Sequence, residues 1–183
     1  MGGKMIRHMG LDLSLTSTGI CIADDTSVIT PKSRGAERLH AVSSHIMSLI
    51  YSNDINLVCL EGYSFASRNS QAHSIGELGG AVRMRLWEGG IPYIEIPPTS
   101  RAKFATGRGN AAKTEVMSAV SAKTGIVFSG SGADDMCDAW ILYEMCNAFM
   151  GVSKYEWSLS SMTALDKVDW SPIDSLQSHN EGE

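Results

Sequence analysis

The spacing of apolar and polar positions predicts strands that come first as a meander and then alternate with helices. Residues 6–15 alternate loosely, a Thr/Ser/Gly turn cluster follows, and the next four residues are apolar, which is typical of a β-hairpin. A third strand is expected near residues 27–30. Short apolar runs at 56–60 and 91–96 predict two more strands, the first apolar enough to be a buried parallel strand. Helical periods predict helices over 36–51, 70–87, 112–123 and 134–149.

This order of elements predicts an α/β domain with a mixed five-stranded sheet, an antiparallel meander followed by parallel strands, flanked by helices. The chain of 183 residues has the size of one ordinary domain. After Gly151 the pattern fades into Ser, Asp and isolated Trp. We therefore expect a domain over residues 1–155 and a C-terminal tail over residues 156–183 that is loosely packed or draped on the body.

Composition excludes several classes of protein. No apolar run reaches the roughly 18 residues that span a bilayer. The N-terminus has positive charge but no apolar stretch after it, so no signal peptide is expected. The four cysteines are scattered and form no CxxC pair, a pattern of reduced, buried thiols rather than of disulfides or a zinc site. A cytoplasmic protein without a membrane partner is expected.

The charge is uneven along the chain. The net charge is −5, and residues 156–183 carry six acids against one base, which leaves a neutral body and an acidic tail. Within the body, residues 101–123 form a basic stripe, in which Glu115 is the single acid. A local stripe of this kind suits phosphate binding. The glycines at 107 and 109 would let backbone amides approach phosphates. The residues expected to contact nucleic acid here are Arg101, Lys103, Arg108 and Lys113.

Four carboxylates stand where structure alone would not place them. Asp12 interrupts the first apolar strand, and Glu61 ends the buried strand, where ligand sites of α/β sheets collect. Asp135 and Asp138 lie three residues apart at the start of the last predicted helix, so they share a face. Asp134 or Asp135 could instead cap the helix or pair with its dipole. Capping cannot explain Asp138, which lies a turn deeper.

Together these acids suggest a metal site. Crowded carboxylates repel one another and become tolerable when a hard divalent cation neutralises them. Oxygen-rich sites suit Mg²⁺ or Mn²⁺, and two such ions about 3.5–4 Å apart can promote phosphodiester hydrolysis. The pattern therefore indicates hydrolysis without a nucleophilic side chain.

Four segments also resemble a known family. Residues 10–19, Gly-Leu-Asp-Leu-Ser-Leu-Thr-Ser-Thr-Gly, resemble the first motif of RuvC-type Holliday-junction resolvases, most closely the phage-encoded branch. Residues 60–62 are similar to the second acidic motif, and residues 134–140 to the closing Asp-x-x-Asp-Ala helix. Residues 97–99 and 104–117 are similar to the segment that leads to a family lysine, here Lys113. The resemblance runs from about residue 8 to 148.

The resemblance implies an RNase H-like fold of the retroviral integrase superfamily, a homodimer, and Mg²⁺-dependent nicking of branched DNA, with Mn²⁺ as a substitute. It implies the host cytoplasm as location if the protein is phage-encoded. The residues that it marks as metal ligands are Asp12, Glu61, Asp135 and Asp138, with Lys113 as a further catalytic residue.

The sequence departs from the family pattern in two places. Leu13-Ser14 stands where the bacterial proteins usually have Pro-Gly, so the first turn differs. Asp134 adds an acid to the last motif and leaves the third ligand open between Asp134 and Asp135, with the spacing to Asp138 favouring Asp135.

The loop after the second acid is the other expected DNA contact. In the resembled family an aromatic side chain of this loop stacks on bases at the crossover. Here Tyr63 or Phe65 could stack, which is worth about 1–3 kcal/mol per base. Arg68 and Asn69 follow in the same loop.

Three hypotheses about the function remain open. The first is a Holliday-junction resolvase, and the second is a broader nuclease that debranches forks and flaps. The third is a junction-binding module without activity, against which the four intact acids argue. A sugar-kinase- or actin-like ATPase needs two such domains, and this chain has room for one.

Overall fold

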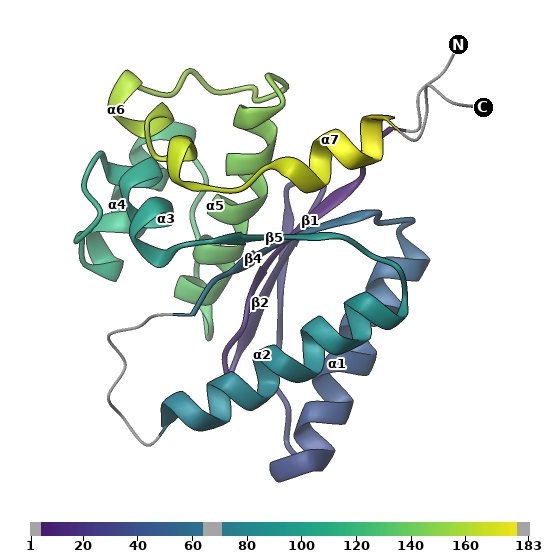
Figure 1. The fold of residues 1–183 in the computed structure, drawn as a ribbon. Helices are drawn as coiled ribbons and strands as arrows, with labels where there is room; N and C mark the ends of the chain where they lie inside the picture. Colours follow the sequence, from purple (N-terminus) through teal and green to yellow (C-terminus); the bar gives the residue numbers. More distant parts are fainter. Residues whose placement is uncertain (1–4, 64–70, 179–183) are drawn as a thin grey trace.

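The computed structural model describes residues 5–63 and 71–178 and is built around one mixed sheet (Figure 1). The strands are β1 (His8–Asp12), β2 (Thr18–Ile22), β3 (Asp25–Ile29), β4 (Leu57–Glu61) and β5 (Tyr93–Ile96), in the spatial order β3-β2-β1-β4-β5. The first three form an antiparallel meander, and β4 and β5 run parallel to β1. This confirms the sheet predicted from the sequence.

The register of the parallel strands brings two of the predicted site acids to one edge. Leu11 in β1 pairs with Leu60 in β4, so the next residues, Asp12 and Glu61, end the two strands side by side. Glu61 in turn pairs with Ile96, the last residue of β5. The carboxyl ends of adjacent parallel strands are the usual place for ligand sites in α/β sheets.

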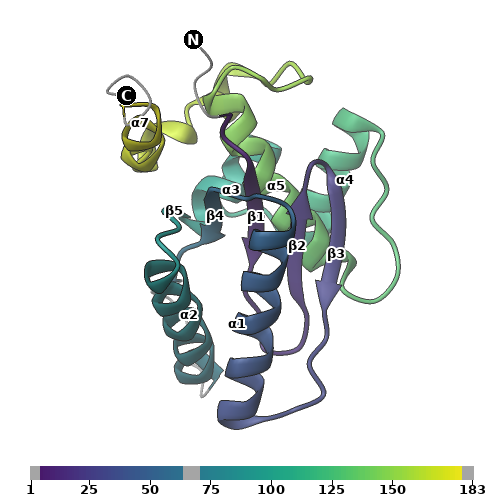
Figure 2. The ribbon, with the colours of Figure 1, turned by 90° about the vertical axis from the view of Figure 1, so that its right-hand side faces the viewer.

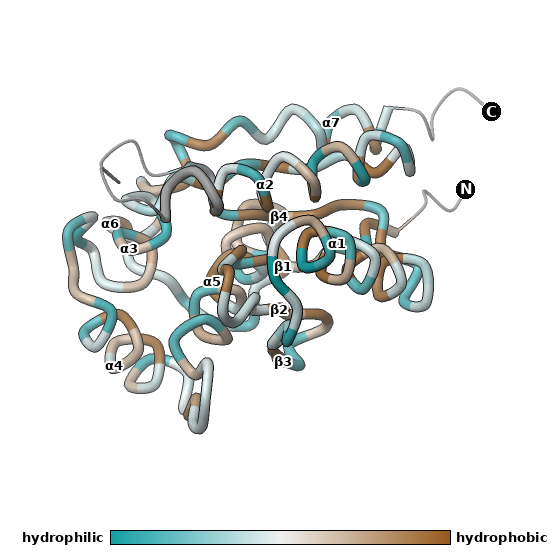
Figure 3. Tube along the Cα trace, turned by 90° about the horizontal axis from the view of Figure 1, so that it is seen from below, coloured by the Kyte–Doolittle hydropathy of each residue, from teal (hydrophilic) through white to brown (hydrophobic). Residues whose placement is uncertain are grey.

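Helices cover both faces of the sheet (Figures 1 and 2). On one face lie α1 (Gly35–Ser52) and α2 (Gln71–Glu88), and on the other α3 (Pro98–Thr106), α4 (Lys113–Thr124) and α5 (Ala133–Phe149). The four helices expected from the apolar periods are confirmed. Each face has its own apolar core, and β4, which lies between them, appears as a largely hydrophobic segment in Figure 3.

Helix α3 is not among the helices predicted from the sequence. Strand β5 ends at Ile96, and Pro98 is the first residue of the helix, a position that its fixed φ favours. Phe104 is fully buried within α3, so tertiary packing stabilises a helix that has no clear apolar period. Gly107, at φ 80°, ends it in the left-handed region.

Helix α5 lies unusually close to the sheet because two glycines of the first motif face it. A Cβ added to Gly10 in β1 would lie 2.0 Å from the carbonyl oxygen of Ala139. A Cβ added to Gly19 in β2 would lie 2.0 Å from that of Asp135. The absence of side chains at these positions therefore sets how near the acids of α5 come to the end of β1.

The C-terminal segment is draped on the body, and the alternative of loose packing is wrong. It contains α6 (Leu159–Met162), the short 3-10 helix η1 (Leu165–Lys167) and α7 (Ser171–Ser178). Leu165, Trp170 and Ile173 are buried in the core shared with α5. Trp170 stacks on Phe149 with ring centroids 4.4 Å apart. Apolar burial therefore holds this segment against the body, while its charged residues up to Ser178 are exposed.

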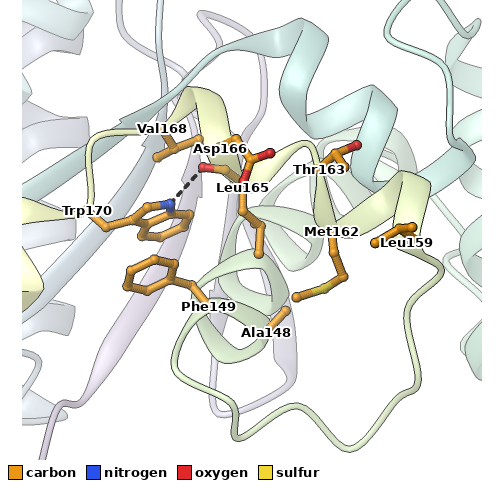
Figure 4. Close-up of a pocket in the computed structure, with 9 residues that line it drawn as sticks. All are labelled: Ala148, Phe149, Leu159, Met162, Thr163, Leu165, Asp166, Val168 and Trp170. Carbon is orange, nitrogen blue, oxygen red and sulfur yellow. Dashed lines mark hydrogen bonds between the residues drawn. The ribbon is translucent and has the colours of Figure 1, made fainter.

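A pocket of about 520 Å³ lies between this segment and the end of α5 (Figure 4). Its wall is mainly apolar and includes Phe149, Met162 and Trp170, with the indole Nε1 of Trp170 donating to the Leu165 carbonyl oxygen at 3.0 Å. None of the predicted site residues lines it.

Two expectations from composition are borne out. Each of the four cysteines is free and buried. Within residues 5–63 and 71–178, no helix has the length and apolar character needed to cross a membrane.

Candidate active site

The predicted acids come together at the carboxyl end of the central strands, beneath the first turns of α5. Asp12 ends β1, and Asp135 and Asp138 project from α5, which packs over Gly10 and Gly19. Asp12 and Asp138 are 6% and 3% exposed, and Asp135 is also buried. Glu61 is partly exposed at the end of β4. Three segments far apart in the sequence therefore contribute carboxylates to one region.

Arg101 connects two of these acids. Its Nε donates to Glu61 Oε1 at 2.6 Å, and its Nη1 is paired with Asp138 Oδ1. The residue is only 8% exposed. Arg101 is therefore not a surface residue of the basic stripe, because the first turn of α3 directs it inward between β4 and α5; its expected contact with nucleic acid stays a prediction.

Lys113 lies at the rim of the same region, at the start of α4. Its Nζ donates to Asp134 Oδ2 at 2.8 Å and lies 4.0 Å from Asp138 Oδ2. The hydrogen bond from Lys113 lowers the pKa of Asp134 below its ordinary value. Asp134 thus faces a surface lysine, whereas Asp135 is buried, which favours Asp135 as the member of the cluster.

The protonation of Asp12 reflects its crowding. Burial, followed by the nearby charge of Glu61, raises the pKa of Asp12 from 3.8 to about 7. Arg101 and Lys113 act in the opposite direction, and Asp135 adds to the rise. Burial also raises the pKa of Asp135. Burial first, and the neighbouring acids second, therefore favour the protonated form of Asp12.

The donor set fits a hard divalent cation in its chemistry. All four acids offer carboxylate oxygens, the ligands that Mg²⁺ and Mn²⁺ prefer, and a cation would offset the charges of Glu61 and Asp135, which add to the effect of burial in raising the pKa of Asp12. Among the residues that the structure describes, however, no three such side chains are already grouped closely enough to hold an ion. Arg101 takes oxygens of Glu61 and Asp138 instead.

The remaining expected DNA contacts are distributed unevenly. Arg108 is exposed and paired with Glu115, and Lys103 is half-buried on α3. Tyr63 is 44% exposed, but Arg83 lies over its ring at 4.3 Å from the centroid, so one face of the ring is covered. The other three expected contacts of the loop, Phe65, Arg68 and Asn69, lie outside the described residues.

Sequence reasoning missed the inward position of Arg101, although a signal existed. Arg101 follows β5 by five residues, and β5 is the parallel neighbour of the strand that ends in Glu61. A residue in the first turn after such a strand is placed at the ligand edge of the sheet. Its position after the strand was more informative than its membership of a basic stretch.

Comparison with known proteins gives a consistent result. The model of the family described as crossover junction endodeoxyribonuclease RuvC matches residues 2–140. A protein of that description from Halorhodospira halophila is 31% identical over 155 residues, which cover 79% of this chain and 90% of the relative. One from Sorangium cellulosum is 30% identical over 122 residues, which cover 67% of this chain and 65% of the relative.

Solved structures share the fold. Thermus thermophilus RuvC in complex with a Holliday junction substrate superposes with a TM-score of 0.61 at 21% identity, covering 83% of this chain and all of the other. The yeast mitochondrial Holliday junction resolvase Ydc2 gives 0.53 at 11% identity, covering 96% of this chain and 83% of the other. The predicted RNase H-like fold is thereby confirmed.

Proposed function

The chain belongs to the RuvC family of crossover junction endodeoxyribonucleases, and we propose that it is a Holliday-junction resolvase that nicks branched DNA by metal-dependent hydrolysis. One observation carries the proposal. Asp12, Glu61, Asp135 and Asp138 come from β1, β4 and α5 and meet at one end of the sheet, beside the basic residues of α3 and α4.

The four acids would hold Mg²⁺, with Mn²⁺ as a substitute. The bound cation supplies charge that favours deprotonation of the attacking water and stabilises the leaving oxygen. In the reaction the water oxygen forms a bond to the phosphorus and the bond to the 3′-oxygen breaks, which leaves a 5′-phosphate and a 3′-hydroxyl.

The basic residues of the chain would place the DNA strand. Lys113 lies at the rim within 4.0 Å of Asp138, so its ammonium group would meet a phosphate that enters the site. Arg108 is exposed and would contact a neighbouring phosphate. Such contacts set the position of the strand and carry no sequence information.

Resolution of a four-way junction requires two symmetric nicks. A homodimer with two copies of the site related by a twofold axis provides them, and we include a homodimer in the proposal. A broader preference for forks and flaps remains the second candidate, supported by the same site, since the chemistry at the phosphate does not depend on the number of arms.

The test is cleavage of labelled four-way, fork, flap and linear duplex DNA with Mg²⁺, Mn²⁺ or EDTA, with Asp12→Asn beside the wild type. We expect paired symmetric nicks in the four-way junction, none in EDTA, and none with Asp12→Asn although it still binds the junction. Equal cutting of forks and flaps would favour the debranching nuclease. Cutting by Asp12→Asn at the wild-type rate would overturn the site assignment.

A further inference from the structure

We propose that Arg101 is the built-in counter-charge of the carboxylate cluster. Its guanidinium pairs with both Glu61 and Asp138 while no metal is bound, and the metal must displace it from these oxygens. The inference rests on the proposed function, because it concerns the same metal site. It adds a residue that sets the affinity of the site for its metal ion and the arrangement of the site before the ion binds.

The position of Arg101 supports this role. Its guanidinium bonds to acids from two separate elements, Glu61 at the end of β4 and Asp138 in α5. The Arg101 side chain is 10% exposed, whereas that of Lys113, the other cation near the cluster, is 60% exposed. An arginine keeps its proton under all ordinary conditions, so the positive charge is permanent. Arg101 is therefore the buried, fixed counter-charge of the cluster.

A permanent cation at this place solves a problem of the metal-free protein. Four carboxylates gathered at one end of the sheet repel one another, and buried charges need partners. Arg101 satisfies one oxygen of Glu61 and one of Asp138. The cluster can therefore fold and persist before an ion arrives.

The same contacts compete with the metal. The guanidinium partly neutralises the oxygens with which it pairs and holds both carboxylates in its own geometry, which weakens them as ligands; no three acids of the described part of the chain are grouped as metal ligands. Binding of the ion thus includes the cost of breaking the Arg101 pairs. A change that weakens these pairs is therefore expected to strengthen metal binding.

The experiment measures Mn²⁺ binding to the full chain without DNA, by isothermal titration calorimetry, for the wild type and Arg101→Gln. We expect Arg101→Gln to bind Mn²⁺ about tenfold more tightly, within the usual range of coupling between two sites. Thermal unfolding in EDTA should show a lower melting temperature for the variant, which Mn²⁺ restores. A purely structural tie predicts lower stability with unchanged or weaker Mn²⁺ binding, and that result would overturn the proposal.

The matched control is Arg83→Gln. Arg83 is similarly buried, with 13% of its side chain exposed, and its Nε also pairs with a glutamate, Glu95, which lies outside the cluster. We expect no change in Mn²⁺ affinity. If Arg83→Gln raised the Mn²⁺ affinity as much as Arg101→Gln, the cause would be a general effect of charge, and displacement of Arg101 by the metal would be contradicted.

A measurement on the wild type covers the case in which Arg101→Gln does not fold. The Nε–H of Arg101 should give a protected NMR signal in EDTA that shifts or exchanges faster as Mg²⁺ is added. If this signal stayed constant while calorimetry recorded metal binding, displacement of Arg101 would be contradicted and the metal site of the proposed function would stand. If neither the wild type nor the variant bound Mn²⁺, the metal site of the proposed function would be refuted, and with it the displacement of Arg101 by the metal.

Discussion

The two ends of helix α5 carry buried acids with different surroundings. Asp138 in its second turn is 3% exposed and Glu144 further along is 1% exposed. Asp138 faces Arg101 and Lys113, and it lies in the same carboxylate cluster as Asp12, Glu61 and Asp135. Glu144 accepts hydrogen bonds from neutral donors, Asn147 Nδ2 at 3.1 Å and Trp157 Nε1 at 2.9 Å, and from the hydroxyl of Ser153.

The comparison separates a site from an anchor. Both acids are equally buried, so burial alone indicates no chemistry. Glu144 has its oxygens satisfied by donors from its own helix and from the start of the C-terminal segment, and it ties that segment to the body. Asp138 shares its surroundings with other acids, and two cations, Arg101 and Lys113, offset their charge. A buried acid is a candidate for catalysis when its neighbours leave charge that a ligand can neutralise.

The largest expected effect tests the site end of the comparison. Asp138→Asn removes a proposed metal ligand and keeps the shape of the side chain. We expect junction cleavage to fall by about a thousandfold or more, since metal stabilisation of the transition state is worth several kcal/mol. Stability should change little, because Arg101 keeps Glu61 as a partner. Single-turnover cleavage and junction binding measured on the same sample check this.

Asp166→Asn is the matched control for that substitution. Asp166 is an exposed aspartate in η1, so its change should leave cleavage at the wild-type rate. If Asp138→Asn cleaved junctions at the wild-type rate, Asp138 would be a structural acid like Glu144, and the two acids of α5 would not differ in role.

The next effect concerns pH and the metal-free protein. The pKa of Asp12 is raised to about 7 by burial and then by Glu61, from 3.8. Between about pH 4 and 7 the folded state therefore holds a proton that the unfolded state has lost. Stability from this group is fully present below pH 4 and is lost as pH rises toward 7. The expected loss is up to about 4 kcal/mol.

Urea unfolding in EDTA at a series of pH values measures this loss. Asp12→Asn has no proton to lose at this position, so its curve should be flatter than that of the wild type over the same window. Parallel curves for the two proteins would mean that Asp12 titrates normally and that the acids do not crowd one another as described.

The two ends of α5 also differ in what the sequence could predict. Asp12, Glu61 and the two acids of α5 stand out locally, since each interrupts an apolar element or shares a helical face. The charge pattern of residues 101–123 marks every base alike, so the inward position of Arg101 could be predicted only from its place just after β5. Helix α3 was missed for a related reason: packing of Phe104 against Trp157, with centroids 4.2 Å apart, supports it from far along the chain.

The smallest of these effects tests the anchor end. Glu144→Gln replaces an acceptor of three hydrogen bonds with a group that offers one oxygen and a competing amide donor. We expect the free energy of unfolding to fall by about 2–3 kcal/mol, the usual value of hydrogen bonds to a charged group. Unfolding followed by tryptophan fluorescence measures the loss. Cleavage of junctions should stay at the wild-type rate at temperatures where the variant is folded.

The exposed Glu156 gives the matched control for Glu144→Gln, since Glu156→Gln should leave both stability and cleavage unchanged. If Glu144→Gln kept its stability and lost cleavage, Glu144 would act on the site and the anchor would be misassigned. If it lost stability alone, while Asp138→Asn lost cleavage alone, one helix would carry two buried acids with separate tasks. The partners of each acid, cations and acids for one and neutral donors for the other, would then account for that separation.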